Sequence, residues 1–278
     1  MAARAKSTRF LILSDTHDDA FPSSTEKADV VLHCGDLTKF GGLSNYRRAI
    51  ENISRMNAEL KLIIAGNHDV SLDPAWWDYS LDKHDDPDEP IYARALFTEE
   101  KDKGIHLLDE GTHTFRLRNG TSFTIYCSPY TPEFNRFAFA YFPDEDRFNN
   151  GENPIPEGVD IVMTHGPPEV SQEDSRWELD RSSKGEHCGC PKLFKAIARA
   201  RPKLHCFGHI HEGHGAQVID WSTNTLRARE EHRNLKISEA AENETLFVNA
   251  AITTRKLEPN NEPWIVDLEL HQTAEETY

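Results

Sequence analysis

The chain has 278 residues, of which 37% are hydrophobic and 28% are charged, a composition typical of a globular protein with a substantial core. Its formal net charge of −16 repels nucleic acid backbones, and no apolar run approaches the 18 residues of a membrane span. The first apolar run is too short for a signal peptide, and five scattered cysteines favour free thiols. We therefore expect a cytoplasmic, intracellular protein with one domain over residues 1–278 and no nucleic acid or membrane partner.

Taken in chain order, five apolar runs of strand length stand out, at residues 10–13, 30–32, 62–65, 161–163 and 204–207. Their richness in branched residues is typical of strands buried on both faces. Apolar residues at helical spacing predict an amphipathic helix over residues 44–60 and a second helix between Pro191 and Pro202. This alternation of strands and helices predicts an α/β fold.

Other segments alternate in hydrophobicity with period two. Residues 114–117 and 122–127 flank Asn119-Gly120, a pair that predicts a β-hairpin. Residues 246–249 and 266–270 are expected to be later strands, and the charged residues 225–243 to be a surface excursion. We expect two packed sheets, a β-sandwich core flanked by helices, rather than one open sheet.

Each of the five apolar runs leads into a segment that contains aspartate, asparagine or histidine. These segments are Asp15-Thr16-His17, Gly35-Asp36, Gly66-Asn67-His68-Asp69, Thr164-His165-Gly166 and Gly208-His209-Ile210-His211. In α/β sheets, the loops at the carboxyl ends of the strands form the ligand-binding crevice. Side chains that are far apart in sequence are therefore expected to converge at one place.

The residue types of these segments are those of a metal centre. The candidate ligands are Asp15, His17, Asp36, Asn67, His165, His209 and His211. Imidazole and carboxylate groups suit ions such as manganese, iron and zinc. Seven ligands are too many for a single four-coordinate zinc, but they are right for two ions if one carboxylate bridges them. We expect two divalent metal ions, manganese first, with iron or zinc as the alternatives.

The five motifs, in this order, resemble the calcineurin-like metallophosphoesterase superfamily over residues 8–252. Thr164-His165-Gly166-Pro167-Pro168 and residues 201–213 resemble one branch more closely, the metallophosphoesterase-domain-containing phosphodiesterases of the fetal-brain protein type. The resemblance implies a metal-dependent phosphoric ester hydrolase with a metallophosphoesterase-like fold and its metal site at the strand ends. For the branch, it implies hydrolysis of cyclic nucleotide phosphodiesters, notably 2′,3′-cyclic ones.

The resemblance also implies a division of the ligands. The first metal is held by Asp15, His17 and His211, the second by Asn67, His165 and His209, and Asp36 bridges both. It further implies that His68 acts on the substrate, with Asp69 as the residue that orients it. The alternative roles for Asp69 are a helix N-cap or a surface carboxylate.

Phosphoester hydrolysis needs an activated nucleophile and neutralisation of charge on the phosphate oxygens, and two metal ions supply both. We expect a metal-bridging hydroxide to attack phosphorus, with His68 as the general acid for the leaving oxygen. A ligand histidine cannot serve, because its metal-binding nitrogen must be unprotonated. Asn67, His68 and His214 are the expected contacts of a small phosphoester or nucleotide substrate.

Three other functions compete with this hypothesis. Phosphoprotein Ser/Thr phosphatases carry an Asp-Arg-Gly element and read Gly-Asn-His-Glu, whereas this chain has no arginine over residues 35–41 and has Asp69 in place of the glutamate. A DNA nuclease would need a basic stripe. A catalytically silent nucleotide-binding or scaffold protein would be expected to lack a ligand. Trp76, Trp77 and Tyr79 either stack on a base or pack beneath a loop, and the oligomeric state stays open.

Overall fold

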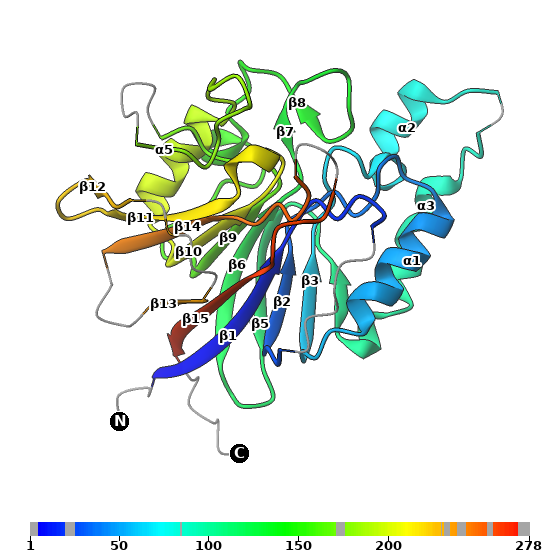
Figure 1. Ribbon diagram of the computed structural model, residues 1–278. Coiled ribbons are helices and arrows are strands. Elements are labelled where there is room, and N and C mark those ends of the chain that lie inside the picture. The colour runs from blue at the N-terminus through cyan, green and yellow to red at the C-terminus, as the bar shows by residue number, and fades with distance from the viewer. Residues whose placement is uncertain are drawn as a thin grey trace.

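The computed structural model describes residues 5–19, 26–83, 85–170, 176–228, 230, 234–237, 243–254 and 258–271. Two mixed sheets pack face to face, and helices cover their outer sides (Figure 1). This arrangement confirms the predicted α/β class with a two-sheet core flanked by helices. No helix in the part of the chain that the structure describes is long and apolar enough to cross a membrane. All five cysteines are free thiols, as expected.

The first sheet has six strands. In spatial order they are β13 (Asn234–Ile237), β15 (Trp264–His271), β1 (Ala5–Leu13), β2 (Val30–His33), β3 (Leu60–Ile63) and β4 (Ile105–Leu107). Strands β1 to β4 run parallel, with Phe10 opposite Val30 and Val30 opposite Leu60. Because β1, β2 and β3 are parallel, the polar segments that follow them emerge at the same edge of the sheet.

The second sheet has seven strands. In spatial order they are β12 (Thr225–Leu226), β11 (Gly215–Asp220), β14 (Glu244–Asn249), β10 (Leu204–Phe207), β9 (Ile161–Thr164), β6 (Ser122–Ser128) and β5 (Gly111–Arg116). Its central strands β14, β10, β9 and β6 are parallel. In Figure 1 the loops that follow β9 and β10 meet those that follow β1, β2 and β3 above the two sheets.

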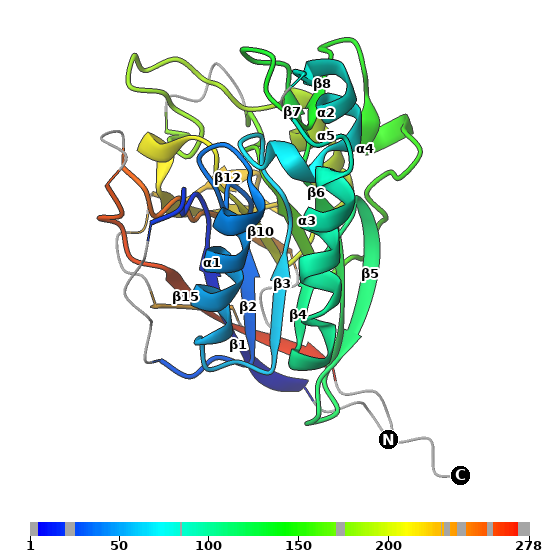
Figure 2. The same cartoon turned by 90° about the vertical axis from the view of Figure 1, so that its right-hand side faces the viewer.

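Between the sheets lies a buried apolar layer to which both contribute, with Phe10 of β1 packed edge to face on Phe123 of β6. The outer face of the first sheet is covered by α1 (Leu43–Ser54) and α3 (Glu89–Thr98), which Figure 2 shows in front of β2 and β3. The outer face of the second sheet is covered by α4 (Arg147–Asn150) and α5 (Pro191–Ala200). Each sheet is thus covered on both faces, by the other sheet and by helices, which explains the continuous apolar runs of its central strands.

Short elements complete the fold. At the edge where the polar segments lie they are the helix α2 (Pro74–Ser80), the 3-10 turns η1 (Val70–Leu72) and η3 (His211–Gly213), and the paired strands β7 (Thr131–Pro132) and β8 (Ala140–Tyr141). The 3-10 turn η2 (Lys101–Lys103) lies at the opposite edge, just before β4. The predicted hairpin is confirmed as β5 and β6, whose turn contains Gly120 at φ 86°. The helix predicted after Pro191 is also confirmed, and it ends at a left-handed Arg201 just before Pro202.

Two sequence predictions need correction. The helix expected over residues 44–60 ends at Ser54, because Leu60 pairs with Val30 and the intervening residues must turn the chain back into β3. Met56, which continues the helical spacing, packs in another apolar cluster, with Leu11. The segment at 225–243 is not only a surface excursion. It contributes β12 and the edge strand β13, while residues 229, 231–233 and 238–242 lie outside the described part.

Candidate metal centre

The polar segments are tied together by backbone hydrogen bonds. The Asp15 amide donates to the Gly35 carbonyl at 2.9 Å, and the His17 amide donates to the Asp36 carbonyl at 3.1 Å. On the second sheet, the Gly208 amide donates to the His165 carbonyl at 2.9 Å. Neighbouring parallel strands therefore continue their pairing into the loops, which fixes the side chains that the loops carry.

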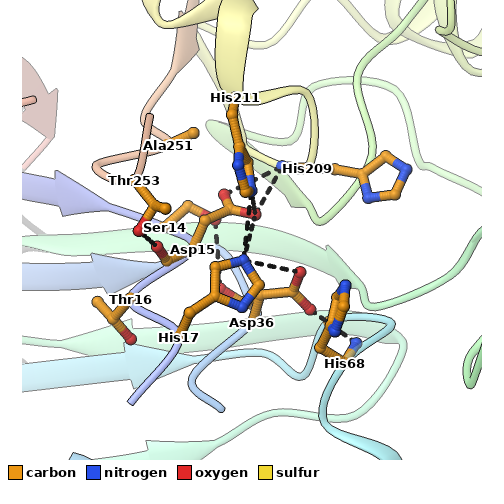
Figure 3. Close-up of polar contacts among 12 residues, drawn as sticks. Ser14, Asp15, Thr16, His17, Asp36, His68, His209, His211, Ala251 and Thr253 are labelled. Atoms are coloured by element: carbon orange, nitrogen blue, oxygen red, sulfur yellow. Dashed lines mark hydrogen bonds and ion pairs between the residues drawn. The ribbon is translucent and has the colours of Figure 1, made fainter. Parts of the chain in front are cut away.

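Asp15, His17 and His211 form a first group whose ligand atoms all lie within 4.8 Å of one another. The His17 and His211 Nε2 atoms are 3.2 Å apart, and the Asp15 Oδ1 atom lies 3.4 Å from His211 Nε2 (Figure 3). The Asp15 carboxylate also accepts a hydrogen bond from the His209 amide. The first group thereby links the end of β1 to the segment after β10.

Asp36, His165 and His209 form a second group of the same compactness. His165 Nε2 lies 2.9 Å from Asn67 Oδ1 and 3.4 Å from Asp36 Oδ1, and the His165 and His209 rings meet edge to face. The structure therefore brings together all seven residues that the sequence singled out as candidate ligands. Six belong to the two groups, and Asn67 adjoins the second through His165.

The Asp36 carboxylate lies between the two groups. Its Oδ2 atom is 3.7 Å from His17 Nε2, and its Oδ1 atom is 3.4 Å from His165 Nε2. Figure 3 shows this carboxylate beside the His17 ring, joined by a dashed line to the same His17 nitrogen that faces His211. A carboxylate whose two oxygens face different groups has the geometry needed to contact two ions at once.

Backbone carbonyls set the orientation of two candidate histidine ligands. His17 Nδ1 lies 3.2 Å from the Thr38 carbonyl, and His165 Nδ1 lies 2.8 Å from the Cys34 carbonyl. A carbonyl can only accept, so each Nδ1 carries the hydrogen and leaves Nε2 with its lone pair in the neutral ring. The lone pair of His17 Nε2 then faces His211 Nε2 at 3.2 Å and the Asp36 carboxylate at 3.7 Å. Imidazole nitrogens and carboxylate oxygens this close together are donors that fit a divalent metal.

The charges of the site also favour a bound cation. Burial opposes the negative charges, yet the hydrogen bond and charge of His211 hold the pKa of Asp15 well below its usual range, and His165 does the same for Asp36. Burial also opposes a charge on His165, but Asp36 raises the pKa of His165 to about 9. Burial lowers the pKa of His209 to about 4. Two buried carboxylates therefore demand positive charge, and a dication would take the place of the His165 proton.

Four candidate ligands sit on strained backbone. Asp15, His17, Asp36 and His209 have φ values of 58°, 45°, 56° and 67°, in the left-handed region that non-glycine residues seldom adopt. Such conformations persist only where the surroundings enforce them, and they cluster at functional sites. Gly208 matters for a related reason, because a Cβ at this position would collide with Ser14 and with the Asp15 carboxylate.

His68 lies beside the groups without belonging to either. Its amide donates to Asp36 Oδ1 at 2.9 Å, which Figure 3 shows, and its Nδ1 lies 2.8 Å from the Lys39 carbonyl. Its ring contacts the His17 ring edge to face at 5.0 Å between centroids. Since Nδ1 donates to the carbonyl, Nε2 is the nitrogen that is left to exchange a proton with a bound molecule.

Asp69 was expected to orient His68, but its carboxylate does not contact the His68 ring. Instead, it accepts hydrogen bonds from the amides of Leu37, Thr38 and Gly66 and from the Thr38 hydroxyl, at 2.9 to 3.1 Å. Nor is it a surface carboxylate or a side-chain N-cap, because it is fully buried and makes no cap hydrogen bond to η1. Asp69 therefore joins the loop that carries Asp36 to the loop that carries His68.

His214 lies outside both groups, and its ring contacts the Trp264 indole at 5.4 Å between centroids. Other residues of the site left no signal in the sequence. The carbonyls of Cys34, Thr38 and Lys39 orient histidines, but any residue type supplies a carbonyl. Phe137, which contacts the His68 ring, comes from the connection between β7 and β8, where no motif stands out.

Comparisons with known proteins agree with this geometry. The sequence profile of the calcineurin-like phosphoesterase family matches residues 8–213. Metallophosphoesterase domain-containing protein 1 from Homo sapiens is 32% identical over 94% of this chain and 71% of its own length, and the Mus musculus protein gives the same values. The UPF0046 protein T07D4.2 of Caenorhabditis elegans is 26% identical over 97% of this chain and 62% of its own.

One solved crystal structure superimposes with a TM-score of 0.51 at 13% identity, over 81% of this chain and 99% of that one, which indicates a shared fold alone. The family assignment depends instead on the sequence match, which spans all the strand-end motifs from Asp15 to His211. The chain therefore belongs to the calcineurin-like phosphoesterase family.

Proposed function

We propose that this phosphoesterase is a phosphodiesterase for small molecules, with cyclic nucleotides as its preferred class, and that it works at a dinuclear metal centre. The observation that carries the proposal is the position of Asp36, whose two carboxylate oxygens face two separate groups of candidate ligands. Asp15, His17 and His211 would hold one ion, Asn67, His165 and His209 the other, and Asp36 both. Manganese is the proposed metal, because the mixed nitrogen and oxygen donors suit it.

When bound, two such ions would supply a water activated near neutral pH and would offset charge on the phosphate oxygens. The protein's own contribution is to fix the donors. His17 and His165 are each held by a backbone carbonyl, and Asp15 by the His209 amide. These contacts set the donor positions before any ligand arrives, which lowers the cost of reorganisation during the reaction.

His68 is the proposed general acid. Its Nδ1–H is engaged with the Lys39 carbonyl, so Nε2 is the atom that would pass a proton to the leaving oxygen. The hydrogen bond from the His68 amide to Asp36, together with the contact between the His68 and His17 rings, keeps His68 beside the carboxylate that faces both groups. A residue with this role should be half-exposed so that it can meet the substrate, and His68 is.

Two features favour a small diester over a phosphoprotein. The loop after Asp36 has no arginine to clamp a phosphate monoester dianion, and the net charge of −16 opposes acidic macromolecular partners. A diester carries a single negative charge and makes less demand on such a clamp. The resemblance of residues 164–168 and 201–213 to one phosphodiesterase branch supports cyclic nucleotides within that class.

The test is a turnover panel with the purified full chain, stripped of metal by a chelator and reloaded in turn with manganese, iron and zinc. The substrates are 2′,3′-cyclic AMP, 3′,5′-cyclic AMP, bis(p-nitrophenyl) phosphate, p-nitrophenyl phosphate and a phosphoserine peptide. We expect the diesters to be hydrolysed with higher kcat/KM than the monoesters, and only after metal is restored. Preferential dephosphorylation of the peptide, or no turnover of any diester by the metal-loaded protein, would overturn the proposal.

A further inference from the structure

Aromatic side chains from three separate segments gather beside His68. The Phe137 ring lies 4.4 Å from the His68 ring between centroids, tilted by 40°. Phe40 follows Lys39, whose carbonyl holds His68 Nδ1, and the Phe40 ring meets the Trp76 ring edge to face at 6.0 Å. We refer to Phe40, Trp76 and Phe137 as the aromatic rim.

Hydrogen bonds join two of the three segments of the rim, those of Trp76 and Phe137. Trp76 Nε1 donates to the Arg136 carbonyl at 2.7 Å, which anchors the residue next to Phe137. The Phe139 amide donates to Asp73 Oδ2 at 2.7 Å, so the connection between β7 and β8 is attached to the start of α2 twice. These two rings are therefore positioned before a ligand binds, so the protein would lose little conformational entropy on binding.

The exposure of Phe40 is the feature that packing does not explain, whereas Trp76 and Phe137 are half-buried. Phe40 is 63% exposed although it sits next to the residue that orients His68. Trp77, one residue along from Trp76, shows the contrasting case, since it is buried and donates to the Asp86 carbonyl within its own segment. Ligand sites commonly combine exposed aromatic rings with a few placed polar groups, as found here around His68.

We infer that the aromatic rim binds the planar base of a nucleoside phosphate by stacking, and so selects nucleoside esters over esters that lack an aromatic group. This inference rests on the proposed function, because it assumes that the phosphate lies at the metal groups beside His68. The rim is flanked by basic residues, since Lys39 precedes Phe40 and Arg136 precedes Phe137. Stacking itself needs no charge, so it tolerates the acidic character of the whole chain.

The test compares two ligands that differ only in the base, AMP and ribose 5-phosphate, by calorimetric titration of the manganese-loaded full chain. Stacking of one base on an aromatic ring changes affinity by roughly ten- to a hundredfold. We expect the protein to bind AMP at least about tenfold more tightly than ribose 5-phosphate. Phe137→Leu keeps an apolar side chain against His68 but removes the planar face, and should reduce this affinity ratio by about tenfold.

Phe142→Leu is the matched control, because Phe142 is 69% exposed and makes no ring contact with His68 or the rim among the described residues. It should keep the affinity ratio of the unmodified protein, and Phe137→Tyr should keep it too. Equal affinity for the two ligands in the unmodified protein would overturn the inference. So would a ratio that Phe137→Leu leaves unchanged, or one that Phe142→Leu lowers as strongly.

Failure of the base-stacking inference is distinguishable from failure of the proposed function. If the protein hydrolyses the 2′,3′-cyclic phosphate of a methyl riboside but binds AMP no better than ribose 5-phosphate, the function stands and the rim inference falls. If no diester is hydrolysed while the AMP preference is present and Phe137→Leu removes it, the rim inference stands and the function falls. Thermal unfolding of each variant shows whether a changed ratio reflects a damaged fold.

Discussion

The hydrogen bonds of Asp69 allow a quantitative prediction about stability. Its buried carboxylate accepts from the amides of Leu37, Thr38 and Gly66 and from the Thr38 hydroxyl, and so connects the loops after β2 and β3. Asp69→Ala removes the acceptor and leaves these donors buried. The Thr38 hydroxyl can rotate to another partner, but the three amides cannot.

A buried donor without a partner destabilises a fold by about 1–3 kcal/mol. Water entering the space left by the carboxylate would satisfy part of the deficit. Burial also raises the pKa of Asp69 to about 7, so the charge that is lost was itself unfavourable. We therefore place the net loss near the lower end of the sum, at about 3–5 kcal/mol in the free energy of unfolding.

The assay is urea unfolding of the chelator-treated protein, which separates the loop contacts from any stabilisation by bound metal. Asp78→Ala is the control, because Asp78 is an exposed carboxylate on α2. We expect Asp78→Ala to change stability by less than about 0.5 kcal/mol. A loss of less than about 1 kcal/mol for Asp69→Ala would refute the reasoning, since it would mean that the three amides find other partners.

Three further changes test other parts of the structure. His68→Ala should retain metal, measured by mass spectrometry of bound ions, yet lower kcat/KM by about 10²–10⁴-fold, most for poor leaving groups; equal slowing across leaving groups would count against an acid role. Gly208→Ala should lower metal content, because its Cβ would displace the Asp15 carboxylate; full occupancy would show that the loop can yield. Phe123→Ala opens a cavity between the sheets and should destabilise by about 3–5 kcal/mol in urea unfolding, and a loss below about 1 kcal/mol would show that the sheets close over the gap.

The sequence predicted the sheets and the candidate ligands well because both leave strong local signals. Strands buried on both faces appear as continuous apolar runs, and each run is followed within a few residues by aspartate, asparagine or histidine. Asp15, Asp36 and His165 could be found in this way. Parallel pairing places Asp15 and Asp36 at one edge of the first sheet and His165 at one edge of the second, and the packing of the two sheets brings these edges together.

The failures have a common physical cause, which is that tertiary pairing overrides local pattern. Leu60 continues a helical spacing, but its pairing with Val30 recruits it to β3. Asp69 stands next to His68 in sequence, yet its carboxylate turns toward the Thr38 amide of another loop. Neither the Lys39 carbonyl nor the Phe137 ring could be assigned to the site from the sequence, because contacts between loops leave no periodic pattern in it.

Manganese titration followed by mass spectrometry and electron paramagnetic resonance tests whether Asp36 joins two metal ions, as proposed above. We expect two ions for each chain, with the spectrum of an exchange-coupled pair. Asp36→Ala should lower the content of both ions and abolish the coupling, whereas Asp78→Ala should leave both unchanged. A single ion for each chain, two uncoupled manganese ions, or a coupled pair that survives in Asp36→Ala would contradict a bridging role for Asp36.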